Sequence, residues 1–228
     1  GGSQESGVSS GDTWEWDGAL WTQRRPSTSP PGRSRHSLAY DAALQRVVLV
    51  GGVTGTSYLS DVWDWDGTNW VQRSPGTLPP GRALGVLAFD AARQRLVLVG
   101  GVAGNTYLSD TWEWDGTRWV QRTPATSPPR RGSHALAYDA ARQRVVLFCG
   151  ISREPGEPSG FVRFTDTWEW DGTTWLNRGP PLAPQVITSQ AMAYDAVRRR
   201  VVLFGGSDGG GIRGETWVWD GTSWTDRT

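Results

Sequence analysis

Residues 112–119 read W-E-W-D-G-T-R-W, and the pattern W-x-W-D-G-x-x-W occurs five times in this chain of 228 residues. The five copies contain all fifteen Trp and occupy residues 14–21, 63–70, 112–119, 168–175 and 217–224. Their first residues are 49, 49, 56 and 49 positions apart. Self-similarity at a nearly constant period predicts a repeat architecture with one supersecondary unit per repeat.

The Trp motif predicts two short strands joined by a tight turn. In residues 13–16 the two Trp alternate with polar residues, so both rings lie on one side of the pleat. Asp17-Gly18 is a preferred pair for a hairpin turn, and Trp21 then begins the returning strand.

Two further segments recur four times each between the Trp motifs. The first reads L-A-Y-D or a close variant, at residues 38–41, 87–90, 136–139 and 192–195. The second reads V-V-L-F-G-G or a close variant, at residues 47–52, 96–101, 145–150 and 201–206. A short β-branched run is typical of a strand buried on both faces, and the Asp that ends the first segment favours a turn. Each repeat therefore holds four short strands, and no helical pattern of useful length occurs.

A four-stranded unit repeated about every 50 residues fits the blade of a β-propeller. One blade cannot bury both of its faces alone, whereas a ring of blades lets each cover its neighbours. We therefore predict an all-β fold, a β-propeller of four-stranded antiparallel blades.

The order R-x-x-H, L-A-Y-D, V-V-L-F-G-G and D-x-W-x-W-D-G-x-x-W resembles the kelch repeat, in particular the bacterial kelch-type propellers with a Trp-rich second half. The resemblance covers nearly the whole chain, and it is specific because the motifs recur in register. It implies that L-A-Y-D is the innermost strand of each blade. It also favours a secreted or cell-envelope location. The chain contains 23 Arg and no Lys, which is consistent with a GC-rich bacterial genome.

This strand order predicts one propeller domain over residues 1–228. It places complete blades at residues 33–74, 82–123, 131–179 and 187–228, and a half blade with only its two outer strands at 1–25. Gly1-Gly2 matches Gly51-Gly52 in position, so we expect the chain to be an excerpt of a propeller with at least five blades. A self-contained ring with one half blade, and Gly1-Gly2 as a cloning remnant, are the alternatives.

Composition excludes several function classes. The 23 Arg balance 23 acidic residues, so no basic surplus favours nucleic acid or an anionic membrane surface. No apolar run approaches the roughly 20 residues that a membrane span needs. A single Cys149 excludes an internal disulfide framework.

We expect no metal or cofactor. His36 and His134 occupy the R-x-x-H position, but two histidines without a nearby third ligand make a poor metal site. Galactose oxidase has a distantly similar kelch propeller and uses copper with a modified Tyr–Cys pair. The resemblance does not extend to that site, and we expect Cys149 to be a small buried hydrophobe.

The repeated Trp and carboxylates have a structural and a functional interpretation. The Trp could stack on sugars or bases, but their identical recurrence favours packing between blades. Carboxylates between the paired Trp could act as acids or bases, but their recurrence opposite Arg favours cross-strand ion pairs. These carboxylates are Glu15, Asp64, Glu113 and Glu169, and the arginines are Arg24, Arg73, Arg122 and Arg178.

Sequence variation concentrates in the loops after the double glycine and in the Pro-rich connectors, which share one face of the predicted ring. Such variation is typical of a binding surface, with drift of unconstrained loops as the alternative. We therefore predict a non-catalytic binding or scaffold module for a protein, peptide or carbohydrate ligand. An enzyme that uses the propeller as a frame is the second hypothesis.

Arginines and tyrosines are the candidate ligand contacts. Arg33, Arg82 and Arg131 begin the innermost strands of three consecutive blades, where a ring would bring them to the channel mouth. Because Arg suits planar contact with carboxylates, the ligand would be an acidic peptide or glycan. Bonds from these arginines to carbonyls of the neighbouring blade are the alternative. The loops add Tyr58, Tyr107, Arg153 and Arg163 to the predicted site.

Overall fold

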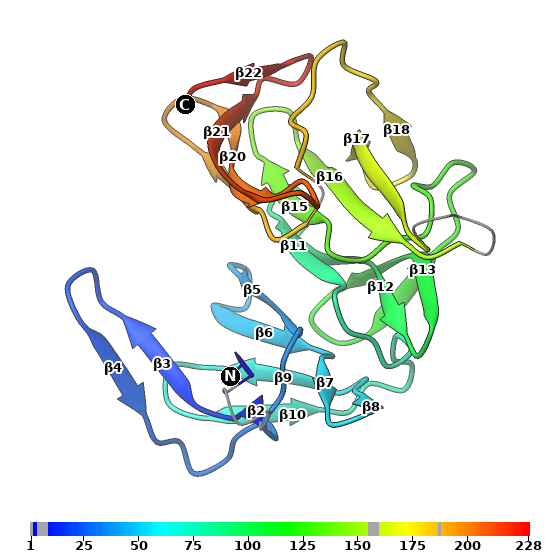
Figure 1. Ribbon diagram of the computed structural model, residues 1–228. Coiled ribbons are helices and arrows are strands. Elements are labelled where there is room, and N and C mark those ends of the chain that lie inside the picture. Colours follow the sequence, from blue (N-terminus) through cyan, green and yellow to red (C-terminus); the bar gives the residue numbers. More distant parts are fainter. Residues whose placement is uncertain (1, 4–8, 155–159, 187) are drawn as a thin grey trace.

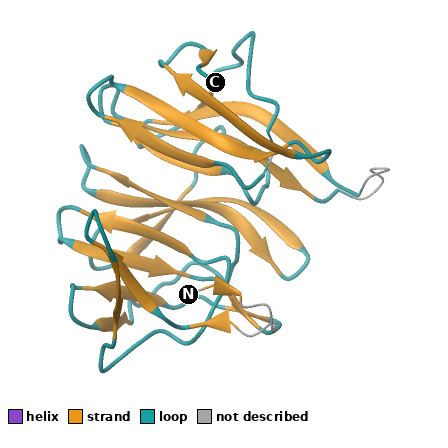
Figure 2. Ribbon diagram, turned by 60° about the vertical axis from the view of Figure 1, so that its left-hand side comes forward, coloured by secondary structure: helices purple, strands orange, loops and turns teal. Residues whose placement is uncertain are grey.

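The computed structural model describes residues 2–3, 9–154, 160–186 and 188–228. Strands and loops make up this part of the chain, and it contains no helix (Figure 2). It accordingly offers no helical segment long and apolar enough to span a membrane.

Four antiparallel sheets of four strands follow one another along the chain, and we call them blades 1 to 4. Blade 1 comprises β5 (Ser37–Asp41), β6 (Arg46–Val50), β9 (Val62–Trp65) and β10 (Trp70–Arg73). Blade 2 comprises β11 (Val86–Asp90), β12 (Arg95–Ala103), β13 (Thr106–Trp114) and β14 (Trp119–Arg122). Blade 3 comprises β15 (Ala135–Asp139), β16 (Arg144–Ser152), β17 (Val162–Trp170) and β18 (Trp175–Asn177). Blade 4 comprises β19 (Ala191–Asp195), β20 (Arg200–Ser207), β21 (Ile212–Trp219) and β22 (Trp224–Asp226).

Three two-stranded sheets complete the fold. The hairpin of β3 (Thr13–Trp16) and β4 (Trp21–Arg24) is the predicted half blade. The strands β1 (Gly2–Ser3) and β2 (Ser9–Ser10) pair beside it. In blade 1 the loop between β6 and β9 forms β7 (Val53–Thr54) and β8 (Ser57–Tyr58). The predicted all-β propeller with four complete blades and a half blade is confirmed.

The blades form an arc that runs from the β3–β4 hairpin to blade 4 (Figure 1). The L-A-Y-D strands line its inside, because β5 lies against β11, β11 against β15, and β15 against β19. Within each blade the strand order from the inside outward is the order along the chain. The predicted innermost position of L-A-Y-D is therefore confirmed.

Alternation along the strands gives each blade two different apolar faces. The Trp face points to the preceding blade, and the aliphatic face points to the next one. Between blades 1 and 2, for example, Trp114 and Trp119 pack against Val48 and Val50. The other two interfaces between complete blades repeat this arrangement. Each blade therefore buries its apolar surface only when it has a neighbour on both sides.

The predicted burial of the paired Trp is confirmed in blades 1 to 4 and is wrong in the half blade. Both Trp of each W-x-W pair are buried in the complete blades. In the half blade, Trp14 and Trp16 are 49% and 52% exposed. The reason is that no described sheet packs against the Trp face of the β3–β4 hairpin.

The double glycine allows consecutive blades to approach closely. Gly51 and Gly100 have φ of 67° and 55°, and a Cβ on either would come within 2.6 Å of a carbonyl oxygen of the next blade. Cys149 takes the same place in blade 3 with a φ of 61°. Its side chain is buried, as predicted, and burial raises the pKa of the thiol.

The carboxylate between the paired Trp forms the predicted cross-strand ion pair. Glu15–Arg24 and Arg178–Glu169 are paired at 2.7 Å and 2.5 Å, and blades 1 and 2 repeat the pair. The same carboxylate also accepts a hydrogen bond from a Trp of the next blade. Trp170 Nε1 donates to Glu113 Oε1 at 3.0 Å, and Trp219 Nε1 donates to Glu169 Oε1 at 3.1 Å.

The Trp at the end of each motif has its own partner in the preceding blade. Trp175 Nε1 donates to Thr111 Oγ1, and Trp224 Nε1 donates to Thr167 Oγ1, both at 2.9 Å. Blade 1 departs from this pattern because it carries Val62 in place of Thr and Asp64 in place of Glu. As a result, the buried indole N–H groups of Trp114 and Trp119 have no hydrogen-bond partner within the described residues.

Candidate binding face

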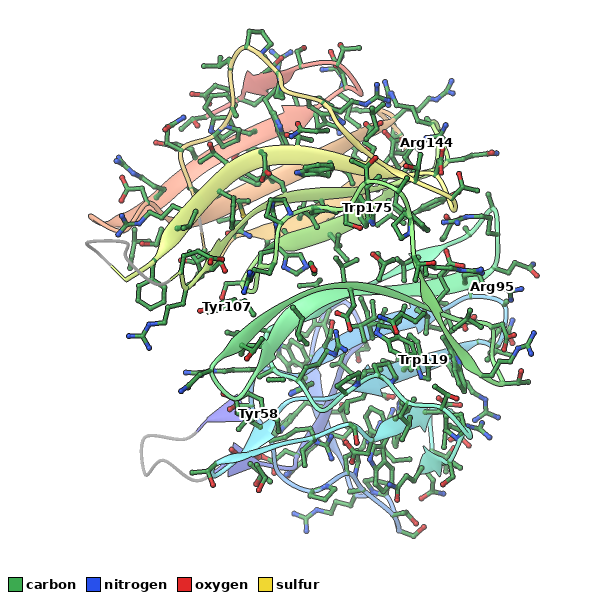
Figure 3. The ribbon with its side chains drawn as sticks, turned by 90° about the vertical axis from the view of Figure 1, so that its right-hand side faces the viewer. Tyr58, Arg95, Tyr107, Trp119, Arg144 and Trp175 are labelled. Atoms are coloured by element: carbon green, nitrogen blue, oxygen red, sulfur yellow. The ribbon has the colours of Figure 1, made fainter. Side chains whose placement is uncertain are left out.

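The two faces of the arc differ in the loops that they carry. Figure 3 shows Tyr58 and Tyr107 on one face, which we call the loop face, and Arg95 and Arg144 on the opposite one, the turn face. The turn face consists of near-identical turns in which an Asp side chain accepts backbone N–H bonds. Asp66 Oδ1, for instance, accepts from Thr68 N–H and Asn69 N–H, each at 2.8 Å. Such uniformity fits a structural role, so the loop face is the candidate site.

The arginines predicted to line the channel mouth are buried instead. Arg33, Arg82 and Arg131 expose 1–2% of their surface. Each guanidinium binds an Asp of its own blade in bidentate fashion, and the three partners are Asp61, Asp110 and Asp166.

The same guanidiniums also bind backbone carbonyls within the blade. Arg33 donates to the carbonyls of Pro31 at 3.1 Å and Gly51 at 3.0 Å, and the other two arginines repeat these bonds. Burial opposes ionisation of Asp61, but hydrogen bonds from Arg33 and Trp63 outweigh it and lower the pKa of the carboxyl.

The ligand-binding role predicted for Arg33, Arg82 and Arg131 is therefore corrected, because buried and paired guanidiniums do not form an exposed positive arc. Their side chains fasten the start of the innermost strand to the third strand of the same blade. Contact with the neighbouring blade comes from their main chain: Gly52 N–H donates to the Arg82 carbonyl, and Gly101 N–H donates to that of Arg131, both at 2.8 Å.

A residue that the sequence did not single out takes the exposed position at the channel mouth. Arg35 has a left-handed backbone with φ of 56°, as do its counterparts Leu84, Ser133 and Ser189. Leu84 N–H donates to the Arg35 carbonyl at 3.0 Å, and Ser133 N–H donates to the Leu84 carbonyl at 3.3 Å. This strained conformation recurs where the blades meet around the channel. In the sequence, the third position of R-x-x-H reads Arg, Leu, Ser and Ser in successive blades. This variation between blades could have identified Arg35 as a candidate ligand contact.

The channel between the inner strands is a cavity of about 370 Å³ that Arg35, His36, His134 and Gln190 line in part. Burial lowers the pKa of His36 to about 4 and that of His134 to about 3, with a further contribution from nearby positive charge. Both imidazoles are therefore neutral near pH 7. The described residues contain no cluster of three His, Cys, Asp or Glu side chains placed to hold a metal ion.

Beside the channel mouth the loops enclose a hollow of about 470 Å³, and both Arg35 and Tyr58 line it. The Tyr58 hydroxyl donates to the Gly104 carbonyl at 3.1 Å, which joins the loops of blades 1 and 2. Burial raises the pKa of Tyr107, and the charges of Arg153 and Arg35 oppose this rise. The structure thus brings the predicted Tyr58, Tyr107 and Arg153 together with Arg35.

The long loop of blade 3 carries the remaining predicted residues. Arg153 lies over the ring of Phe161, 5.6 Å from its centroid. Arg163 lies farther along, against the Gly209 turn of blade 4. Residues 155–159 of this loop lie outside the described residues, as does Ile187, which replaces the channel Arg in blade 4.

These features define a β-propeller whose loop face combines aromatic and cationic side chains around a channel mouth. Comparison with known proteins narrows this class no further, since no family model matches the chain and no curated protein shows significant similarity to it.

Proposed function

We propose that this chain is a kelch-type propeller that acts as a non-catalytic binding module. Its ligand would carry carboxylates, on a peptide or a glycan, and would bind at the loop face over Arg35, Tyr58, Tyr107 and Arg153. The observation that carries the proposal is an open hollow that Tyr58 and the exposed Arg35 line, with Tyr107 near enough for the charges of Arg153 and Arg35 to act on its pKa.

The pairing of the arginines supports this choice of ligand. Most arginines of the blades have a carboxylate partner within 4 Å, as Arg82 and Arg178 do. Within the part of the chain that the structure describes, Arg35, Arg153 and Arg163 form no such ion pair, and neither do Arg95 and Arg144 on the turn face. An exposed guanidinium without a carboxylate is free to bind one bidentately, and a tyrosine ring beside it adds apolar contact.

Paired substitutions on the two faces test the proposal. We expect Arg35→Gln with Arg153→Gln to weaken binding of an oligoglutamate peptide or an oligogalacturonate at least tenfold, since a charge-assisted hydrogen bond contributes about 1.5–3 kcal/mol. Arg95→Gln with Arg144→Gln removes the same charge from the turn face and is the matched control. Comparison of the two probes by calorimetry distinguishes a peptide from a glycan. Equal weakening by both double variants, or no binding by the parent chain, would refute the site.

An enzyme that uses the propeller as a frame is the alternative. Acid–base catalysis needs titratable groups that converge with suitable pKa values. The described channel lining has Arg35 and two histidines whose pKa values burial lowers to about 4 and 3. This supports binding over catalysis. Mass spectrometry of any bound probe after prolonged incubation tests it, and conversion of the probe would favour the enzyme.

A further inference from the structure

An apolar groove opens between the half blade and blade 1. It has a volume of about 220 Å³, and its floor includes Leu38, Val47 and Leu49 on the Trp face of blade 1. Thr13 and Glu15 of β3 form one wall.

The equivalent space is filled at the interface between blades 1 and 2. There, Ala39, Val48 and Val50 of the two inner strands of blade 1 cover Leu87 and its neighbours. Leu87 is 5% exposed, whereas its counterpart Leu38 in the groove is 49% exposed. The groove therefore occupies the place that two inner strands fill between other blades.

The unpaired edge of β3 and a tyrosine on β5 of blade 1 also lack the partner that their counterparts have elsewhere in the described residues. Within the described residues β3 pairs only with β4, so its other edge has no strand beside it. The hydroxyls of Tyr138 and Tyr194 accept N–H bonds from Ala92 and Ala141 of the preceding blade. Tyr40 holds the same position on β5, and its side chain is exposed.

We propose that this groove binds a β-hairpin of β-branched and small apolar residues, which adds to the free edge of β3. Addition of a strand to an exposed edge is a common mode of peptide recognition, with main-chain bonds for affinity and alternate side chains for specificity. The occupant is a segment that resembles the inner strands of this chain's own blades. This site is independent of the acidic ligand proposed for the loop face.

The pairing in blade 1 sets the register of the bound hairpin. Val48 and Val50 of β6 lie opposite Asp64 and Val62 of β9 and point to blade 2. By the same geometry, the guest residues opposite Glu15 and Thr13 point into the groove. Guest residues opposite Trp14 and Trp16 point away from it.

A synthetic hairpin with the sequence of residues 37–50 is the probe. We expect it to bind the chain saturably and to change the Trp fluorescence of the groove. In the peptide, Val48→Asn with Val50→Asn should weaken binding at least tenfold, because two amides would be buried without partners. Val47→Asn with Leu49→Asn makes the same chemical change on the outward side and should weaken it much less.

A variant of the chain completes the test. Leu38→Arg places a charge in the groove and should abolish binding of the peptide. Val197→Arg, at a site 89% exposed on the turn face, is the control with the same added charge. Unchanged melting temperatures would show that both variants fold.

Absence of binding by the parent chain, or equal weakening by the two peptide variants, would overturn the proposal. It would also fail if the chain alone formed a dimer that Leu38→Arg dissociates, because a second copy would then occupy the groove. Binding that survives Leu38→Arg would place the peptide elsewhere.

Discussion

Replacement of Asp64 by Glu is expected to stabilise the interface between blades 1 and 2. In three other places the carboxylate at this position is Glu, and it accepts the indole N–H of the next blade. Asp64 is one methylene shorter, and among the described residues its Oδ1 atom and Trp114 Nε1 are both buried without a hydrogen-bond partner. An unsatisfied buried polar group costs about 1–3 kcal/mol, and a net hydrogen bond contributes about 0.5–1.5 kcal/mol.

We therefore expect Asp64→Glu to raise the free energy of unfolding by about 1–2 kcal/mol. Val62→Thr supplies the missing acceptor for Trp119, and its gain is smaller because a buried methyl, worth about 1 kcal/mol, is lost. The reverse change, Glu169→Asp, should remove the partner of Trp219 and destabilise the interface between blades 3 and 4 by a similar amount. The double variant Val62→Thr with Asp64→Glu reproduces the pattern of blades 2 and 3.

Urea unfolding measures the free energy, and hydrogen exchange of the indole N–H groups measures the bond directly. Slower exchange of Trp114 in Asp64→Glu, with an unchanged exchange rate for Trp170, would support the reasoning. If Asp64→Glu is neutral or destabilising and Glu169→Asp costs nothing, the Trp–carboxylate bond does not stabilise the interface and the reasoning fails.

Three further predictions concern burial and charge. Trp114→Ala should cost about 3–5 kcal/mol on unfolding by urea, while Trp14→Ala in the half blade should cost less than about 1 kcal/mol; similar costs would show that exposure does not explain the difference. Arg82→Gln should destabilise the chain by about 3–5 kcal/mol because it leaves Asp110 partly buried without its counter-ion, and a change below about 1 kcal/mol would contradict the fastening role. The pKa of His134 is lowered to about 3 in the folded chain, so the unfolded chain binds more protons between about pH 3 and 6.5. Stability should therefore decrease as the pH falls through this range, by at most about 1.4 kcal/mol per pH unit. His134→Gln, the residue of blade 4, should reduce this slope in melting experiments between pH 4.5 and 6.5, and an unchanged slope would refute the assignment.

Much of the fold was predictable because its determinants lie within a few residues of one another. Alternating Trp, the Asp-Gly turn and the β-branched run before Gly-Gly each fix a strand or a turn locally, and their recurrence in register identifies the blade. The exposure of Trp14 was not predictable from the same motif. The ring is buried only if another sheet packs against it, and the motif carries no information about which element lies beside it.

The burial of the channel arginines depends on contacts between distant residues. Arg33 and Asp61 are 28 positions apart and meet only when the first and third strands are aligned. The Asp two residues before four of the five W-x-W pairs was a usable signal, since a repeated Arg and a repeated Asp favour a repeated ion pair. The left-handed backbone of Arg35 had no comparable signal, because Arg, Leu and Ser do not favour positive φ.

The repeated residues and the proposed ligand contacts lie in different parts of this molecule. A residue that every blade needs for packing is constrained by two neighbours, so its chemistry is the same around the arc, as with the paired Trp. A residue that contacts a ligand would be free of that constraint, and Arg35, which we propose as such a residue, differs from Leu84, Ser133 and Ser189. The loop face is where the chain's side chains differ most between blades. If the proposed site is correct, ligand recognition depends on the positions at which the repeats differ.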